Sequence, residues 1–135
     1  MNAFIVDLNN KPGELARVAE AIAQKGINIT SFAGATVAGT GAVVLTTNDE
    51  AGTRKAITDI GCTVREVELV MARMEHVPGA LAMVTKKLAD AGINIDAAVP
   101  MSMGGDNVSI AFATDQPAKA REILGVSEAA GMAVG

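Results

Sequence analysis

Residues 12–29 read PGELARVAEAIAQKGINI, and residues 78–95 read PGALAMVTKKLADAGINI. Ten of these eighteen positions are identical, at an offset of 66 residues. The same offset continues beyond this stretch and pairs Gly39, Asp49 and Ile57 with Gly105, Asp115 and Ile123. A repeat at a fixed spacing indicates a supersecondary unit that occurs twice. The sequence therefore predicts two small domains, 1–66 and 67–135, rather than a solenoid.

Each copy has the residue pattern of a strand followed by a helix. In the first copy, residues 4–8 are apolar and β-prone and predict a strand. Pro12 fits the first turn of a helix, where the missing N–H of proline costs nothing. Leu15, Val18 and Ile22 then recur at helical spacing, so we expect them to form the buried face of that helix. The corresponding residues of the second copy are Pro78, Leu81, Val84 and Leu88.

The rest of each copy predicts three more strands and a second helix. The further strands expected are 28–37, 42–47 and 62–67 in the first copy; in the second copy the first strand is expected at 69–74 and the further strands at 94–103, 108–113 and 131–134. Asp49 and Asp115 are each placed to cap the second helix. The order is βαββαβ, twice, and right-handed crossovers put both helices on one face of an antiparallel sheet. The expected fold class is α+β, with two tandem ferredoxin-like plaits.

The composition excludes several classes of partner. The chain of 135 residues has a net charge of −4, and its 11 Lys and Arg are scattered. Nucleic-acid binding needs a concentrated basic face and aromatic residues for base stacking, whereas this sequence has no Trp or Tyr and 3 Phe. No apolar run approaches the roughly 20 residues that span a membrane, and no signal-peptide pattern is present. A single cysteine, Cys62, favours a reducing, cytoplasmic location.

The sequence contains no pattern typical of a catalytic or metal site. There is one His, His76, and no serine lies in a nucleophile elbow. Cys62 is interpreted as a small half-buried residue rather than a reactive thiol. The dispersed carboxylates match neither a zinc nor a calcium site, and we expect the glycine-rich stretch 38–41 to be a hairpin turn rather than a phosphate loop. We therefore expect no enzymatic activity, no catalytic residue, no metal and no cofactor.

The helix start at 12–15 is the strongest candidate for binding. The first N–H groups of a helix have no partner within it, and with the helix dipole they favour an anion such as a carboxylate. Gly13 leaves room for close approach, and the Asn10 side chain both donates and accepts hydrogen bonds. Asn28, which begins the next strand, is expected to point back toward the same end of the unit. The alternative is that Asn10 is a turn residue and Asn28 a helix-exit residue, with no ligand.

These residues together resemble the ACT domain. The resemblance rests on a strand, a short loop with Asn, Pro-Gly, a helix rich in Ala, Leu and Val, and Gly-Ile-Asn-Ile, and it covers both copies. It implies ferredoxin-like regulatory modules that pair side by side into one continuous sheet and bind amino acids at the interface. Such domains are attached to aspartokinase, phosphoglycerate dehydrogenase and similar enzymes. Free-standing tandem chains without a catalytic domain also occur in the family.

The resemblance also implies which residues meet the ligand. Residues 9–13 are similar to the Asn-x-Pro-Gly loop of the serine-binding ACT domain of phosphoglycerate dehydrogenase. Asn10 would meet the ligand from the loop, and Asn28 would meet it from the strand of a neighbouring domain. Leu8 stands where that enzyme has a histidine, which argues against serine as the ligand.

The second copy departs from the first at the loop. His76 replaces the loop Asn, while Asn94 is kept. His76 is either a ligand contact or a solvated loop residue. The candidate ligand-binding residues are Asn9, Asn10, Lys11, Pro12, Gly13, Glu14, Leu15, Asn28 and Ile29 in the first copy, and Glu75, His76, Pro78, Gly79, Ala80, Leu81, Asn94 and Ile95 in the second. If one copy alone binds, the first is favoured.

The expected function is a regulatory or sensor module that binds a small amino acid and has no catalytic activity. A free sheet edge on a small plait invites pairing with another copy, which predicts a homodimer. The alternative is a regulatory interaction subunit of an amino-acid biosynthetic enzyme that acts through protein contacts. An amino-acid metabolic enzyme is a further candidate partner, whereas nucleic acid and membranes are not expected partners.

Overall fold

The computed structural model describes residues 1–125. These residues group into two compact units, Asn2–Val67 and the residues from Glu68 onward together with Met1. The expected division into two domains, 1–66 and 67–135, stays a prediction. The weak strand expected at 131–134 lies outside the described residues.

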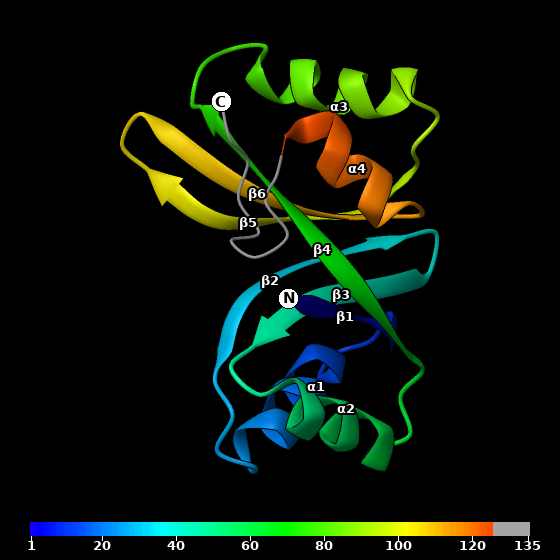
Figure 1. Cartoon of the computed structure of the whole chain (residues 1–135). Coiled ribbons are helices and arrows are strands. Elements are labelled where there is room, and N and C mark those ends of the chain that lie inside the picture. Colours follow the sequence, from blue (N-terminus) through cyan, green and yellow to red (C-terminus); the bar gives the residue numbers. More distant parts are fainter. Residues whose placement is uncertain (126–135) are drawn as a thin grey trace. The chain divides into compact units, whose positions relative to one another are not determined.

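Both units contain helices and strands in the same order (Figure 1). The first unit contains β1 (Asn2–Asn9), α1 (Glu14–Ala23), β2 (Ile29–Val37), β3 (Thr40–Thr47), α2 (Glu50–Asp59) and the beginning of β4 (Val64–Glu75). The second contains the rest of β4, α3 (Ala80–Asp90), β5 (Ile95–Gly104), β6 (Asn107–Thr114) and α4 (Pro117–Leu124). The predicted α+β class with ferredoxin-like repeats is confirmed. No helix within residues 1–125 is long and apolar enough to cross a membrane.

Each unit has an antiparallel sheet whose buried face packs against its helices. In the first unit the strand order is β2-β3-β1-β4, so β2 is an edge strand. Phe4 of β1 pairs with Leu45 of β3, and both side chains are buried. In the second unit the order is β4-β6-β5, and Val70 of β4 pairs with Phe112 of β6. Because side chains alternate along a strand, these apolar residues line one face of each sheet and form the core there.

β4 is one continuous strand of 12 residues, whereas the sequence predicts two strands, 62–67 and 69–74. No glycine or proline occurs within β4, so no residue type that favours a turn interrupts the strand where the two copies meet. The backbone just before it is already bonded to β1, because the Asp7 N–H donates to the Thr63 carbonyl at 3.0 Å. The two repeats therefore share a strand.

α1 starts two residues later than the proline suggests. The helix begins at Glu14, so Pro12 lies before the helix and not in its first turn. Gly13 is the N-cap with a φ of +91°, a left-handed conformation that costs little only for glycine. The Arg17 N–H then donates to the Gly13 carbonyl at 2.9 Å. The second repeat has the same arrangement, with Gly79 at a φ of +88°.

The buried face of α1 differs from the predicted one by one residue. Glu14, Val18 and Ile22 are buried, whereas Leu15 is 48% exposed. Leu81 in the second repeat is exposed as well. Leu15 lines hollows together with residues of the edge strand β2, such as Phe32, instead of packing in the core. The prediction of Leu15 and Leu81 as core residues is therefore wrong.

The two repeats are not related by a constant offset. Phe4 corresponds to Val70, which is 66 residues later, but their partners Leu45 and Phe112 are 67 residues apart. The ladder between β5 and β6 shifts register at 100–102, where a β-bulge absorbs the extra residue. Beyond this bulge, the ungapped pairing of the two copies is therefore wrong by one residue.

This shift changes how the second helix of each repeat is capped. Asp49 caps α2 as predicted, because its carboxylate accepts a hydrogen bond from the Gly52 N–H at 3.0 Å. Asp115 does not cap α4. Gln116 occupies the cap position and makes no side-chain cap bond, while the Asp115 carboxylate accepts from the Asn94 N–H at 2.9 Å.

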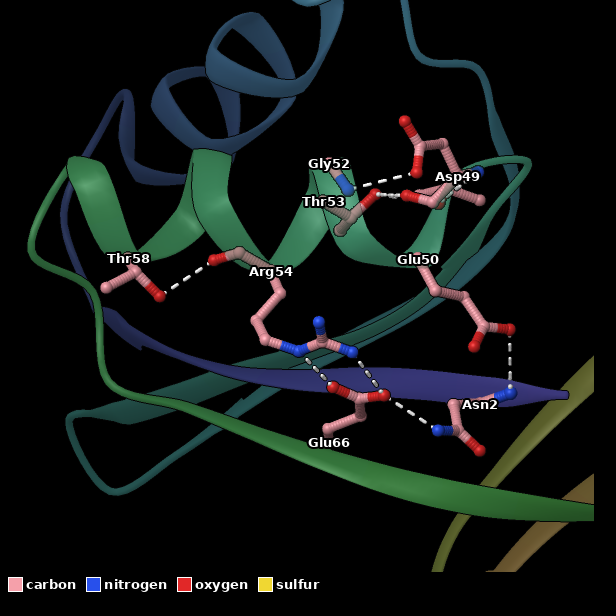
Figure 2. A network of polar contacts seen from close by, with 9 residues as sticks. Asn2, Asp49, Glu50, Gly52, Thr53, Arg54, Thr58 and Glu66 are labelled. Carbon is pink, nitrogen blue, oxygen red and sulfur yellow. Dashed lines mark hydrogen bonds and ion pairs between the residues drawn. The ribbon is translucent and has the colours of Figure 1, made fainter.

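A polar network, shown in Figure 2, holds α2 against β1 and β4. Arg54 Nε and Nη2 donate to the two carboxylate oxygens of Glu66 at 2.7 and 3.0 Å. Asn2 Nδ2 donates to the same carboxylate at 2.7 Å. The Arg54 bonds, followed by the Asn2 bond, lower the pKa of Glu66. In the second unit, Arg121 of α4 makes an ion pair with Glu68 of β4.

Candidate functional site

The loop between the first strand and the first helix has the same backbone bonding in both repeats. The Lys11 N–H donates to the Asn9 carbonyl at 2.9 Å, and the Val77 N–H donates to the Glu75 carbonyl at 3.0 Å. The residues at the tip of each loop are exposed. The identical Pro-Gly pair thus sets the path of the backbone, and the side chains around it determine what each loop can bind.

Glu14 gives the first loop a buried charge. Among residues 1–125 it is the only charged residue that is buried, with 8% of its surface exposed. Asn9 Nδ2 donates to Glu14 Oε1 at 2.9 Å, and Arg17 Nε donates to Oε2 at 3.4 Å. The Asn9 hydrogen bond is the main cause of a lowered pKa for Glu14; Lys11 and Arg17 also lower it, and burial opposes them. The carboxylate is therefore ionised at neutral pH.

Arg17 links this carboxylate to the end of α2. Its Nη1 donates to the Ile60 carbonyl at 2.8 Å, and its Nη2 lies 3.4 Å from Cys62 Sγ. The guanidinium is therefore held by three partners from two parts of the unit. Cys62 is a half-buried free thiol, as predicted.

Two open hollows border Glu14. The larger, of about 640 Å³, extends from Glu14 to Arg17 and Cys62. The smaller, of about 440 Å³, extends from Glu14 to Asn10 and Phe32. Both hollows are lined by Leu8, Asn9, Glu14, Ala35, Gly41 and Ala42. Their sizes suit a small molecule, and pockets of this class typically fix a ligand with a few polar groups.

Gly41 leaves the floor of these hollows open. It pairs with Leu8 across the β1–β3 ladder. A Cβ at Gly41 would lie 3.0 Å from Thr36 Cγ2, which is closer than side chains normally pack. Any larger residue at this position would therefore protrude into the space between Leu8 and Thr36.

The second repeat is filled at the same place. Met74 and Val108 form the corresponding cross-strand pair, and they are only 9% and 6% exposed. Both belong to an apolar cluster against which Ala80 and Val84 of α3 pack. Ala80 occupies the position that corresponds to Glu14. The second repeat therefore has neither the carboxylate nor the open floor.

Asn28 does not lie near the loop of its own unit. Asn9 pairs with Thr40, and Thr40 pairs with Val37 at the end of β2. Asn28 precedes Ile29 at the beginning of β2, so the length of the strand separates it from the loop. Nine residues at about 3.3 Å each correspond to roughly 30 Å. The expectation that Asn28 points back toward the loop is wrong within one unit.

The candidate ligand-binding residues of the second repeat also lie at two opposite ends of the sheet. Asn94 precedes β5 and its amide donates to Asp96 at 2.8 Å, at the opposite end of the sheet from Glu75. His76 lies in the exposed loop, where its backbone N–H donates to the Asp106 carbonyl at 2.8 Å. The structure therefore gathers the loop residues 9–15 and 75–81 in their respective units and leaves Asn28, Ile29, Asn94 and Ile95 at the far ends.

Sequence reasoning did not identify Arg17, Gly41 or Phe32 as part of the site. A usable signal was present, because Arg17 is replaced by Met83 in the second copy and Glu14 by Ala80. These are differences in charge inside an otherwise matched motif. Within the described part of the chain, no three His, Cys, Asp or Glu side chains are placed to hold a metal ion together.

Comparison with known proteins relates the sequence to one family. Residues 4–62 match the family model described as "AHAS small subunit-like ACT domain". No curated protein matches the sequence significantly.

Solved structures match nearly the whole chain. Protein BT0572 from Bacteroides thetaiotaomicron is 26% identical, with a TM-score of 0.76 over 92% of this chain and 85% of that one. The regulatory subunit of aspartate kinase from Thermus flavus is 16% identical, with a TM-score of 0.63 over 90% and 89%. The aspartokinase alpha and beta subunits are 22% identical, with a TM-score of 0.61 over 91% and 89%. The latter two likenesses show the fold alone.

Proposed function

Because the chain is an ACT-domain protein, we propose that it is a regulatory module without catalytic activity of its own and that its first repeat binds a small amino acid. The supporting observation is the hollow beside the first loop, which has a buried carboxylate at Glu14 and an open floor at Gly41. The second repeat has Ala80 and Val108 at these positions, so we assign it no ligand.

The loop offers complementary groups to both ends of an amino acid. A carboxylate fits the N-terminus of α1, where unpaired N–H groups and the helix dipole favour negative charge. The exposed Lys11 ammonium adds positive charge at the same loop. Asn10 lines the smaller hollow and offers both a donor and an acceptor. This arrangement favours a zwitterion over a simple anion or cation.

We further propose that two copies of the chain complete the site through the edge strand β2. Phe32 is 61% exposed there and lies over an apolar hollow of about 180 Å³ together with Leu15. Unpaired strand edges with exposed apolar residues are natural pairing surfaces. Antiparallel pairing of two β2 strands would bring Asn28 of one copy to the Val37 end of the other. That end is paired through Thr40 to the loop of the first repeat.

A thermal-shift screen of the common amino acids tests this function. A ligand present at about 100 times its dissociation constant stabilises a protein by about 2.7 kcal/mol. We expect such a shift for the wild type and for His76→Ala in the second loop. We expect it to be lost in Gly41→Val, which fills the hollow, and reduced in Asn10→Ala, which leaves the core intact. No shift with any amino acid, or a full shift in both Gly41→Val and Asn10→Ala, would contradict the proposal.

A second candidate function is a regulatory subunit that acts on an amino-acid metabolic enzyme by contact alone. The observation that favours it is a set of large exposed apolar side chains in the second repeat, which includes Val77, Leu81, Met83 and Met103. Stoichiometric assembly with such an enzyme, unchanged by any amino acid and weakened by Leu81→Ser with Met83→Ser, would favour this candidate. In either case a cytoplasmic location suits the free Cys62 thiol.

A further inference from the structure

Glu14 is a buried carboxylate that the fold does not require. Ala80 occupies the same position in the second repeat, and α3 begins there after the same left-handed glycine as α1. Removing an ionised carboxylate from water costs free energy that hydrogen bonds must offset. Since the repeat folds with alanine at this position, the helix start gives no reason to keep a charge there. The charge is therefore to be explained by the hollows that Glu14 borders.

The two oxygens of this carboxylate are bonded unequally. Oε1 accepts from Asn9 Nδ2 at 2.9 Å, a normal hydrogen-bond distance. Oε2 accepts from Arg17 Nε at 3.4 Å, whereas a charge-assisted bond is usually about 2.7–2.9 Å long. The shortest hydrogen bond of Arg17 is the one that its Nη1 donates to the Ile60 carbonyl at 2.8 Å. Oε2 is therefore the oxygen with capacity for a further donor from the hollow.

The other charges around the hollows are of both signs. Lys11 lies in the loop, Arg17 on the helix turn above, and Asp7 lines the larger hollow from β1. With Glu14 ionised, two positive and two negative groups face this region, which suits a zwitterion. Without Glu14 the balance becomes positive, which suits an anion.

We propose that Glu14 is the specificity-determining residue of the site, and that it selects a ligand with a protonated amino group over the 2-oxo and 2-hydroxy acids of the same carbon skeleton. This inference rests on the proposed function. An ammonium group gives Oε2 a charged donor at short range. A 2-oxo group has no donor at all, and it would leave the carboxylate facing a carbonyl oxygen. A hydroxyl offers one donor without charge, so the hydroxy acid ranks between the two.

The discrimination is modest because the hollow is open. Closed sites that are built to bond one polar group reject its analogue by factors of about 10⁴ or more. In this open hollow, water can donate to Glu14 in place of the ammonium group that the analogue lacks. We therefore expect the chain to bind the amino acid about 10- to 100-fold more tightly than its 2-oxo analogue.

Calorimetric titration of the full chain tests this inference. The probes are alanine, leucine, phenylalanine and aspartate, each with its 2-oxo and 2-hydroxy analogue. We expect the wild type to prefer the amino acid of at least one set by about 10-fold or more. In Glu14→Gln we expect the preference to fall to about threefold or less, with binding of the 2-oxo acid unchanged or tighter. Glu20→Gln, on an exposed face of the same helix, is the matched control and should behave as the wild type.

A second variant covers the case in which Glu14→Gln does not fold. Glu14→Ala gives the first helix the residue that the second repeat carries at Ala80, so the helix start is expected to be retained, and circular dichroism checks it. A preference for the amino acid that survives in the folded variant overturns the inference and leaves the site standing. Equal binding of the amino acid and the 2-oxo acid by the wild type also overturns the inference and leaves the site standing. If no probe binds the wild type and no common amino acid shifts its melting temperature, the proposed function fails together with this inference.

Discussion

The two repeats follow one backbone path but differ at the head of their first helix. Gly13 and Gly79 have nearly the same φ, and each precedes a helix that packs on its own sheet. Ile22 and Leu88 are equivalent core residues, and both are fully buried. The positions that are identical or equally apolar in the two copies therefore build the frame.

The positions that differ decide whether a hollow exists. The three differences that count are Glu14 against Ala80, Arg17 against Met83, and Gly41 against Val108. The first two replace a charge by an apolar side chain, and the third fills the floor. Burial of the shared apolar faces drives folding, so one copy can lack a hollow while the frame stays the same. The candidate site therefore lies where the sequences of the two copies differ.

The largest effects are expected in the shared core. Ile22→Ala and Leu88→Ala should each lower the free energy of unfolding by about 2–5 kcal/mol, as is usual for a large aliphatic side chain removed from a packed core. Because β4 belongs to both units, we expect one cooperative transition that both variants shift. Urea unfolding followed by circular dichroism measures this. Two transitions, each shifted by one variant only, would show instead that the repeats unfold as independent domains.

Smaller effects are expected at the caps of the second helices. Asp49→Ala removes a side-chain cap and should lower the free energy of unfolding by about 1 kcal/mol. Gln116→Asp supplies the cap that α4 lacks and should raise it by up to about 1 kcal/mol. The same unfolding experiment measures both variants, with Gln116→Ala as a near-neutral control. A loss of stability in Gln116→Asp would mean that the cap position of α4 is not equivalent to that of α2.

The smallest effect is expected on the acid side of the pH profile. The pKa of Glu66 lies below its ordinary value of 4.5, because Arg54 and Asn2 donate to its carboxylate. The unfolded chain therefore binds this proton more readily than the folded one. The stabilisation from Glu66 is complete above about pH 4.5 and is lost as the pH falls through the lowered pKa.

Glu66→Gln should accordingly flatten the decline of the unfolding free energy below pH 4.5 and cost most stability near neutral pH. Urea titrations at several pH values between 3 and 7 measure this dependence. Glu20→Gln provides the comparison with an exposed carboxylate. If the slope for Glu66→Gln equals that of the wild type, the network in Figure 2 does not contribute to acid sensitivity.

The order of the helices and strands was predictable from sequence, because the glycines and the apolar spacing repeat, but the first residue of α1, the cap of α4 and the continuity of β4 were not. The buried face of α1 was not predictable either. Both 14-18-22 and 15-18-22 are helical spacings, and an apolar Leu15 is the natural choice when glutamate is rarely buried. The choice depends on how far the helix lies from the edge strand, and a single helix sequence does not contain that information.

The loop of the candidate site was predictable from sequence, whereas the residues that line the hollow around it were not. Pro12 and Gly13 mark the turn by their own chemistry, whereas Gly41 lines the hollow only because strand pairing brings the hairpin beside the loop. The misplacement of Asn28 has a related cause. Asn28 lies far from the loop because β2 begins next to Asn28 and runs toward Val37, at the end beside the loop. The direction of a strand follows from how the whole unit is assembled and not from the local sequence.

A single inserted residue has opposite consequences in two strands of this chain. In β5, at the edge, the extra residue at 100–102 forms a bulge and the ladder resumes beyond it. In β4, an insertion between Val70 and Met71 would turn the later side chains of that strand to the opposite face, since a strand has a period of two. Ala72 and Met74 would then leave the core of the second unit. An inserted residue is therefore tolerated better in an edge strand such as β5 than in β4, whose side chains pack in the core.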